Sequence, residues 1–280
     1  MNWKIVSLAA AFTVSSAHAA LIGDWRQNEL SGLLIDSTGG HPDGVPTGTP
    51  TYGMPGVPNG TYGSITVTGA TGTSIGYGPS DIDEYFTIGS TNINPVLNLD
   101  PSGSFTVMGW MQPLMSNLAG RTYRIIAGGT AGGADGSWGF GLRLNNLDGT
   151  GSALRFTGFG VADRDGSLFN VTYGSWIHAA VTYSNGALSY FLNGDPVGTN
   201  STLFNADTAN ARLIIGARFG GNDVDQMNGQ LDGVRVYDTV LTQAEIQQAA
   251  VQSVVPEPGA GLLALVAGAG VATRRRRQLS

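Results

Sequence analysis

The chain has 280 residues but no cysteine and a single lysine, Lys4. The lack of cysteine excludes disulfides, so stability must come from a packed core, from strand pairing or from a bound metal. Charged residues make up only 12% of the chain, and glutamate occurs only at positions 29, 84, 245 and 257. The scarcity of Lys and Glu, with 43 glycines and many Thr, Val and Ile, favours strands joined by tight turns over helices.

Residues 1–19 have the order of a secretory signal peptide. Lys4 precedes an apolar run over residues 5–14, which is followed by Ala17, His18 and Ala19. A basic start, an apolar middle and a small-x-small end predict export and cleavage by signal peptidase after Ala19.

Residues 255–280 are typical of a membrane-sorting segment. Pro256, Glu257 and Pro258 precede an almost uncharged run over residues 259–273. A helix of that length spans about 22 Å, less than a bilayer core of about 30 Å, so we expect transient insertion in the inner membrane rather than a permanent anchor. Four arginines that resist translocation follow, and they predict that the upstream domain lies on the far side of the membrane: Arg274, Arg275, Arg276 and Arg277.

This tail resembles the PEP-CTERM sorting signal of Gram-negative bacteria. The Pro-Glu-Pro motif, the apolar run and the arginine block all match, over residues 255–277. The resemblance implies cleavage near Pro256–Pro258 by an exosortase-type membrane protease. It also implies an organism that makes exopolysaccharide, with release of the protein to the cell surface or extracellular matrix.

Residues 20–254 remain, a length that fits one large β domain or two small ones. They hold nine of the 14 basic residues, because Lys4 and four arginines are removed, and nineteen of the 20 acidic residues, because Glu257 is removed, so their net charge is −10. A surface this acidic repels nucleic acid and anionic lipid and favours divalent cations or neutral partners. Basic patches with interleaved aromatics do not occur, so we expect no nucleic-acid binding.

Ten segments have the composition of strands: residues 64–68, 85–88, 105–112, 123–127, 138–144, 154–159, 176–183, 188–193, 212–217 and 230–237. Two Asn-Gly pairs, at 185–186 and 193–194, predict tight hairpins. Thr242 and Glu245 form a capping box that predicts a helix over residues 242–250. Residues 39–63, rich in Pro, Gly and Thr, predict a long surface loop. Together these elements predict an all-β fold, an antiparallel two-sheet jelly-roll sandwich with one short C-terminal helix.

Four blocks, in order, resemble the laminin-G-like (concanavalin A-like) jelly-roll family. Residues 105–111 (FTVMGWM) resemble its F-T-hydrophobic-x-x-W strand, and residues 176–183 (WIHAAVTY) its W-x-H-x-A-x-T strand. Residues 188–194 (LSYFLNG) and 228–237 (NGQLDGVRVY) resemble the two later strands, and residues 241–246 (LTQAEI) continue the last one. The resemblance extends over residues 21–248 and implies one jelly-roll domain.

Carboxylate pairs suited to catalysis are scarce. Retaining glycosidases need two carboxylates about 5–5.5 Å apart. None of the glutamates begins the E-x-D-x-x-E motif of jelly-roll glycosidases. Asp81 and Asp83 share a predicted strand face but adjoin a Gly/Pro turn and lack a third partner. His178 lies mid-strand between apolar residues, which favours a hydrogen-bonded structural role over a general base.

Asp232 is a candidate calcium ligand. It shares a strand face with Val234 and Val236, and a carboxylate entering an apolar face needs a partner, either an arginine or Ca²⁺. The family resemblance implies a structural Ca²⁺ between Asp232 and the N-terminal segment, where Asp36 is the matching acid. Two further pairs could ligate calcium, although aspartates in surface turns are common without it: Asp163 with Asp165, and Asp223 with Asp225.

Aromatic side chains that stack on sugars must be exposed, whereas core burial is the default for each. Trp110 and Trp176 match core positions of the family, and Trp25 lies in a predicted strand. Trp138, between glycines 136 and 139, is the candidate exposed ring for ligand binding. Three tyrosines are loop candidates: Tyr52, Tyr62 and Tyr77.

These features predict an exported, non-catalytic jelly-roll module that binds glycan or a surface protein in an exopolysaccharide matrix. Two alternatives stay open. One is a jelly-roll glycosidase or polysaccharide lyase, which would need a carboxylate pair in an open groove. The other is a purely structural matrix protein, which would have a concave face without aromatics and acids.

Overall fold

A computed structural model describes residues 19–70, 72–78, 84–89, 103–115, 119–129, 138–203, 212–218 and 225–254. The predicted signal peptide up to residue 18, the whole predicted sorting segment 255–280, Asp81, Asp83 and Asp223 lie outside these ranges. In the described part, no helix is long and apolar enough to cross a membrane.

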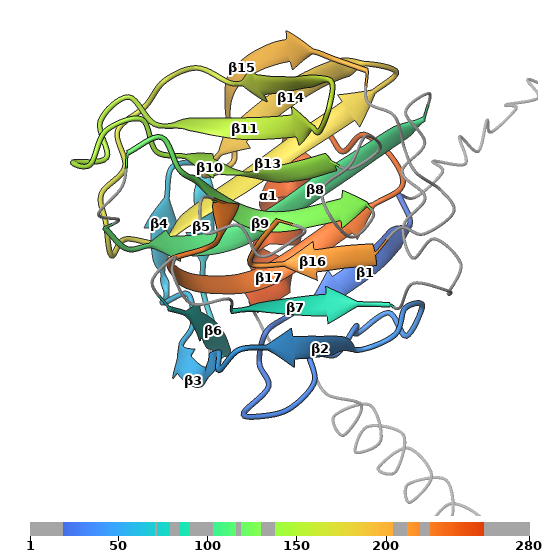
Figure 1. Cartoon of the computed structure of the whole chain (residues 1–280), viewed down its shortest axis with the longest axis vertical. Helices are drawn as coiled ribbons and strands as arrows, with labels where there is room; N and C mark the ends of the chain where they lie inside the picture. The colour runs from blue at the N-terminus through green and yellow to red at the C-terminus, as the bar shows by residue number, and fades with distance from the viewer. Residues whose placement is uncertain are drawn as a thin grey trace, which may run out of the picture.

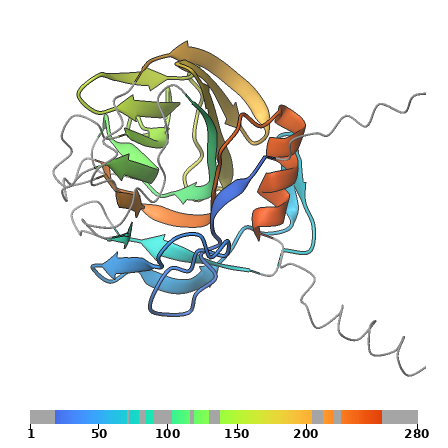
Figure 2. The same ribbon diagram turned by 90° about the vertical axis from the view of Figure 1, so that its right-hand side faces the viewer.

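Two antiparallel sheets face each other, and the helix α1 (Gln243–Val254) lies outside one of them (Figures 1 and 2). Sheet A, next to the helix, has eight strands. Seven follow in the order β15 (Asp195–Ser201), β14 (Ala187–Leu192), β13 (Ile177–Ser184), β8 (Ser104–Pro113), β17 (Gly229–Tyr237), β6 (Thr73–Tyr77) and β3 (Thr51–Pro55), and β1 (Leu21–Trp25) pairs with β17.

Sheet B is the second layer and has seven strands. They follow in the order β12 (Ala162–Asp165), β11 (Ala153–Gly158), β10 (Trp138–Arg143), β9 (Thr122–Gly129), β16 (Arg212–Ile215), β7 (Tyr85–Ile88) and β2 (Gly44–Thr47). A short hairpin of β4 (Gly60–Tyr62) and β5 (Ile65–Val67) lies beside the helix (Figure 2). The predicted all-β architecture with antiparallel sheets and one short helix is confirmed.

The main core fills the space between the sheets, because alternate residues of each strand point inward. Phe105 of sheet A stacks on Tyr183 with ring centroids 4.8 Å apart, and Phe156 of sheet B stacks on the same tyrosine at 6.2 Å. Burying aromatic side chains of this size stabilises a fold by about 3–5 kcal/mol each, judged by truncation to Ala. The inward positions of sheet B are therefore occupied by core residues, and its outward positions are free for other roles.

A second, smaller core lies between the outer face of sheet A, the hairpin β4–β5 and the helix. Trp110 of β8 is fully buried there, and its indole N–H donates to the Ala250 carbonyl of the helix at 2.9 Å. The predicted capping box begins this helix: the Thr242 N–H donates to Glu245 Oε2 at 2.7 Å, and the Glu245 N–H donates to Thr242 Oγ1 at 3.3 Å. The helix runs four residues beyond its predicted end, to Val254.

Both predicted Asn-Gly hairpins are confirmed. Asn185 and Gly186 have φ values of 44° and 90° between β13 and β14, and Asn193 and Gly194 have 52° and 80° between β14 and β15. Both residues of each pair lie in the left-handed region that this two-residue turn requires. These turns set the register of one edge of sheet A.

The prediction of a long surface loop over residues 39–63 is wrong. This segment holds β2, β3 and β4, two of which are edge strands: β2 pairs with β7 at the edge of sheet B, and β3 pairs with β6 at the edge of sheet A. Proline is tolerated in edge strands because one side of such a strand makes no ladder hydrogen bonds. Pro46 in β2 and Pro55 in β3 follow this rule.

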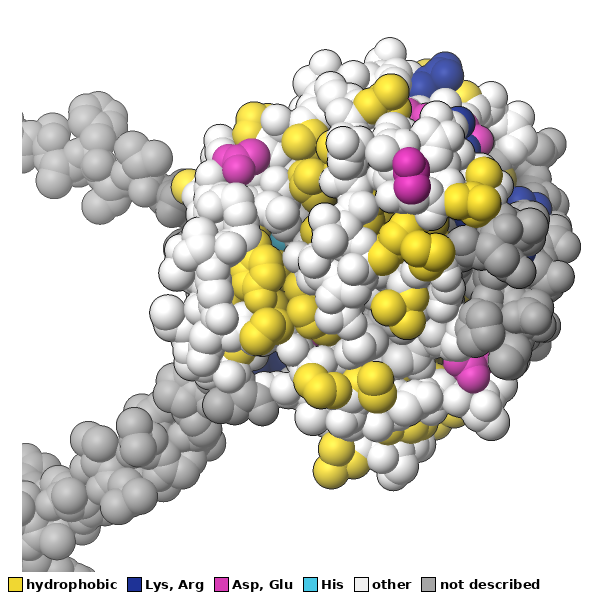
Figure 3. Space-filling view, turned by 90° about the vertical axis from the view of Figure 1, so that its left-hand side faces the viewer, with side chains coloured by type: hydrophobic (Ala, Val, Ile, Leu, Met, Phe, Trp, Pro, Cys, Tyr) yellow, Lys and Arg dark blue, Asp and Glu magenta, His cyan; other side chains and the backbone are white. Residues whose placement is uncertain are grey.

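The side of the molecule shown in Figure 3 carries few charged side chains. Hydrophobic side chains lie on it in small groups between neutral polar ones, as the low charge content of the chain predicts. Scattered apolar residues of this kind are normal on a protein surface. A cluster of paired arginines and aspartates lies on the outer face of sheet B.

Candidate ligand groove on the outer face of sheet B

A groove of about 500 Å³ lies over strands β9, β11 and β12 of sheet B. Strand alternation explains its lining. Tyr123 and Ile125 of β9 enter the main core, so Arg124 between them points to the opposite face. In β11 the inward Phe156 likewise leaves Arg155 and Thr157 on the groove side. The groove is therefore built on the rigid sheet.

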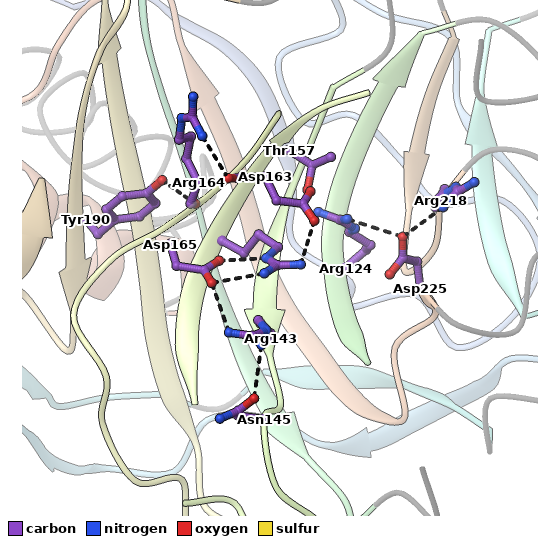
Figure 4. Close-up of polar contacts among 11 residues, drawn as sticks. Arg124, Arg143, Asn145, Thr157, Asp163, Arg164, Asp165, Tyr190, Arg218 and Asp225 are labelled. Atoms are coloured by element: carbon purple, nitrogen blue, oxygen red, sulfur yellow. Dashed lines mark hydrogen bonds and ion pairs between the residues drawn. The ribbon is translucent and has the colours of Figure 1, made fainter. Parts of the chain in front are cut away.

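At one half of the groove, Asp163, Asp165 and Arg143 lie close together (Figure 4), in a charge-balanced network of ion pairs around Arg155. The guanidinium of Arg155 forms a fork with Asp165, at 2.6 and 2.9 Å, and reaches Asp163 Oδ2 at 2.7 Å. Arg143 donates to Asp165 at 3.1 Å, and Thr157 donates to Asp163 Oδ1 at 2.8 Å. Burial raises the pKa of Asp165, but its hydrogen bonds and charge interactions with Arg155 and Arg143 outweigh burial, and the pKa is lowered overall.

The other half places two arginines around one carboxylate (Figure 4). Asp225 Oδ2 accepts a hydrogen bond from Arg124 Nη2 at 3.2 Å and one from Arg218 Nη1 at 3.3 Å. Both guanidiniums also lie near the ring of Phe159, with their Cζ atoms 5.3 and 5.0 Å from its centroid, within reach of a cation–π interaction. Among the residues that the structure describes, this half therefore holds one more positive than negative side chain.

Arg124 is the most deeply placed charge of the groove. Its side chain is 2% exposed, and its Nε and Nη1 have no hydrogen-bond partner among the residues that the structure describes. Burial lowers its pKa, and the neighbouring Asp225 partly offsets that effect. Gly139 of β10 lies beneath it, and a Cβ at that position would be 3.3 Å from Arg124 Nη1. The missing side chain thus leaves room for the guanidinium.

A laminin-G family model, described as the concanavalin A-like lectin/glucanases superfamily, matches residues 80–247. The chain belongs to the concanavalin A-like lectin/glucanase superfamily. No curated protein sequence matches it.

Two similar solved structures share the superfamily fold. Domain 4 of AbnA, an extracellular GH43 arabinanase from Geobacillus stearothermophilus solved with arabinotriose, is 20% identical with a TM-score of 0.54, over 83% of this chain and 98% of that one. The binding domain of Paraclostridial Mosquitocidal Protein 1 is 16% identical with a TM-score of 0.51, over 81% of this chain and 51% of that one.

Trp138, the predicted ligand-binding ring, is buried, so that prediction is wrong. It is 3% exposed at the start of β10, and it stacks on Phe156 with ring centroids 6.2 Å apart and an interplanar angle of 9°. Its neighbour Gly139 is the residue that faces outward, because side chains alternate along the strand. Trp110, Trp176 and Trp25 are buried, as expected of this superfamily's core.

The three tyrosines lie in strands rather than in loops. Tyr77 of β6 is buried and donates to Gln27 Oε1 at 3.1 Å. Tyr62 of β4 packs edge-on against Trp110 at 5.0 Å, and Tyr52 of β3 packs edge-on against Phe86 at 6.1 Å. Their rings thus contribute to packing, and they do not line the groove.

Asp36 and Asp232 are held by separate sets of donors. Both oxygens of Asp36 are occupied: they accept from the N–H groups of Asp24, Thr38 and His41, at 3.0 to 3.1 Å, and from the Thr38 hydroxyl at 2.6 Å. Four hydrogen-bond donors from the chain itself thus surround this carboxylate. In the described ranges, no group of three or more His, Cys, Asp or Glu side chains is placed to hold a metal.

Asp232 of β17 is nearly fully buried and lies across the strand pair from Trp110. Its Oδ2 accepts the Val57 N–H at 3.3 Å, and its Oδ1 has no partner in the described structure. Burial raises its pKa well above the usual value, which favours the neutral acid on this apolar face. The nearby Arg235 pairs with Asp24 instead, at 2.9 and 3.2 Å. Calcium binding by this chain stays a prediction.

One residue of each of the other two candidate calcium pairs lines the groove: Asp163 and Asp225. Arg155 lies between Asp163 and Asp165 and supplies the positive charge there. Asp225 is paired with two arginines, and its predicted partner Asp223 lies outside the described residues.

His178 lies on the outer face of sheet A, in the second core and away from the groove. Its backbone N–H donates to Asn193 Oδ1 at 2.8 Å, and its ring is edge-on to Trp110 at 5.1 Å. Both ring nitrogens lack a partner in the described structure, so the hydrogen bonding predicted for His178 involves its backbone rather than its imidazole. Burial and the charge of Arg235 lower its pKa to about 3.

One segment has the spacing of a catalytic-serine motif, but its structure does not match the turn that such a serine requires. Residues 72–76 (GTSIG) have G-x-S-x-G spacing, but Ser74 lies inside β6 rather than on a strand-to-helix turn. It is buried, and its hydroxyl donates to Gln230 Oε1 at 2.7 Å. The carboxylates of the groove are each paired with arginine, which suits an ionised acceptor better than a general acid.

Sequence reasoning missed the arginines and Phe159. A usable signal was present: Arg124 and Arg155 are single charges inside otherwise apolar strands, at positions that strand alternation turns away from the core. The pairing of Arg124 with Asp225, 101 residues away, had no such local signal.

Proposed function

We propose that this chain is an exported, non-catalytic module that binds glycan at the cell surface or in an exopolysaccharide matrix, in the groove over sheet B. The observation that carries the proposal is the open, polar groove itself, lined by arginine, aspartate and threonine side chains on a rigid sheet. The terminal segments support export, and the tail supports sorting by an exosortase-type protease.

The groove offers what sugar hydroxyls need. A hydroxyl both donates and accepts, and the groove alternates guanidinium donors with carboxylate acceptors. Asp163, whose side chain is 47% exposed, is the acceptor most open to solvent. The structure of AbnA domain 4 with arabinotriose supports an oligosaccharide as the class of ligand for this fold.

Binding without cleavage is the favoured form of this proposal. Glycosidases need one carboxyl group whose pKa is raised so that it can act as an acid. Asp165 instead has a lowered pKa, and Asp163 and Asp225 are paired with arginine. An enzyme acting on polysaccharide is the alternative, and a shortened polymer would reveal it.

The test is binding of residues 20–254, which contain both sheets and the helix, to a panel of neutral and acidic oligosaccharides and polysaccharides. Calorimetry measures affinity, and size-exclusion chromatography measures polymer length. We expect binding at unchanged polymer length, weakened by Asp163→Ala. The matched control is Asp43→Ala, which removes an exposed aspartate outside the groove. Equal loss in both variants, or no binding at all, would contradict the proposal.

A further inference from the structure

We infer that the groove takes an acidic sugar, and that Arg218, with Arg124 beneath it, holds the carboxylate of that sugar beside Phe159. This inference rests on the proposed glycan-binding function and names its ligand class, a glycan that carries uronic acid.

The charge distribution along the groove is the first argument. Around Arg155, two arginines face two aspartates, so that half is neutral. Around Asp225, two arginines share a single aspartate oxygen, so among the described residues that half has one more positive than negative side chain. A local positive site in a domain of net charge −10 is a specific feature, because it opposes the sign of the whole surface.

The unused hydrogen-bond donors of Arg124 are the second argument. Its Nε and Nη1 are buried and unpartnered in the described structure, and buried donors without acceptors are costly. A guanidinium binds a carboxylate best through two parallel N–H donors, and only one nitrogen of Arg124 is engaged by Asp225. Its Nε and Nη1 are closed to solvent, so an anion in the groove would act on Arg124 through its charge rather than through a hydrogen bond.

The two arginines differ in solvent exposure and would therefore act on a ligand in different ways. Arg218 is 26% exposed and lines the groove, so it can contact a ligand directly. Arg124 lies buried below it, where the lower dielectric strengthens its attraction for an anion. Phe159, which contacts both guanidiniums, limits how far they can move and keeps them oriented.

A carboxylate fits this geometry because the same groove already binds carboxylates in this way. Arg155 holds Asp165 through a fork, and the Arg124–Arg218 pair holds one oxygen of Asp225. The ligand carboxylate would extend the pattern by one more acceptor. A sulfate ester shares the negative charge, so the test includes it as a separate arm.

The experiment measures the affinity of residues 20–254 for four oligouronates, built from galacturonate, glucuronate, mannuronate or guluronate, each beside its carboxyl-reduced form. The reduced sugars keep the ring and lose the charge. We expect at least one oligouronate to bind about tenfold or more tightly than its reduced form, as a charge-assisted contact would give. We expect this preference to shrink as salt rises from 50 to about 300 mM.

Two variants test whether Arg218 is the residue that contacts the carboxylate of the sugar. Arg218→Gln should bring the acid and its reduced form within about threefold of each other. Arg164→Gln removes the same charge from β12, where the side chain donates to the Ser201 carbonyl and does not line the groove, and it should keep the full preference. A melting curve for each variant confirms that it folds.

The outcomes separate the two proposals. Equal binding of acid and reduced sugars, binding of neutral glycans alone, or a preference for sulfated over carboxylated sugars overturns this inference and leaves glycan binding in place. Failure of every glycan to bind overturns both. A preference for oligouronates that survives Arg218→Gln overturns the assignment of the arginine pair.

Discussion

Acid should destabilise this chain through His178. Burial and, second, the charge of Arg235 lower the pKa of this residue from 6.5 to about 3, so its ring stays neutral in the folded protein. The unfolded chain binds a proton there below pH 6.5. Between pH 6.5 and about 3 the unfolded state therefore holds the extra proton, and the free energy of unfolding falls as the pH falls.

The size of the effect follows from the width of that window. Each pH unit within it costs about 1.4 kcal/mol, so the His178 contribution at pH 4.5, two units below 6.5, is a loss of about 3 kcal/mol. Such a loss is a large share of the about 5–15 kcal/mol that stabilises an ordinary domain.

The assay compares the wild-type chain with His178→Leu by urea unfolding at pH 7.5 and pH 4.5, followed by tryptophan fluorescence. Leucine has a similar volume and does not titrate. The other titrating groups act alike in both proteins and cancel in the difference. We expect the wild type to lose about 3 kcal/mol more than the variant on acidification. Parallel losses in the two proteins would refute the reasoning about this buried ring.

Three further predictions concern the second core and the helix. Burial raises the pKa of Asp232 above 3.8, so the contribution of this residue to stability is lost as the pH rises above that value. The variant Asp232→Asn should therefore be more stable than the wild type at pH 7.5 in the same urea assay. Equal stability would count against a buried neutral acid. Arg235→Met leaves Arg26 as the remaining ion-pair partner of the buried Asp24 and frees the helix carbonyls that Arg235 binds. Chemical unfolding should show a loss of about 1–3 kcal/mol, and unchanged stability would contradict this. Thr242→Ala removes the helix cap that pairs with Glu245, so the free energy of unfolding measured by heating should fall by about 1 kcal/mol. An unchanged melting temperature would show that the cap contributes nothing.

Local patterns were sufficient to predict much of the fold. The strand β7 has the predicted bounds, 85–88, because a short β-branched and aromatic run follows acidic residues and ends at Gly89. Both Asn-Gly turns and the Thr242–Glu245 cap involve residues within a few positions of one another, so their physics is visible in the sequence.

The edge strands β2 and β3, which follow from the arrangement of the whole fold, and the burial of Trp138 were not predicted. Strands β2 and β3 carry proline and glycine that indicate a loop, and only pairing with β7 and β6 makes them strands. Trp138 has small neighbours in the sequence, yet its ring enters the core because of its phase along β10. Phe140 and Leu142 share the face of Trp138, and that alternation is the signal in the sequence for its burial.

The candidate site depended most on contacts distant in the sequence. Arg124 comes from β9, Arg155 from β11 and Arg218 from the segment after β16, and the sandwich brings them to one face. The composition of the chain alone indicated only an acidic protein with few arginines. The excess of arginine over aspartate at one end of the groove becomes apparent when the ion pairs are assigned.

The most direct test of the groove as the binding site is a nuclear magnetic resonance titration. Isotope-labelled residues 20–254 would receive the tightest-binding glycan of the panel, and backbone amide shifts would be followed. The proposed site predicts shifts clustered in β9, β11 and β12 and around Arg218. Shifts confined to α1 and the β4–β5 hairpin, on the far side of sheet A, would contradict it.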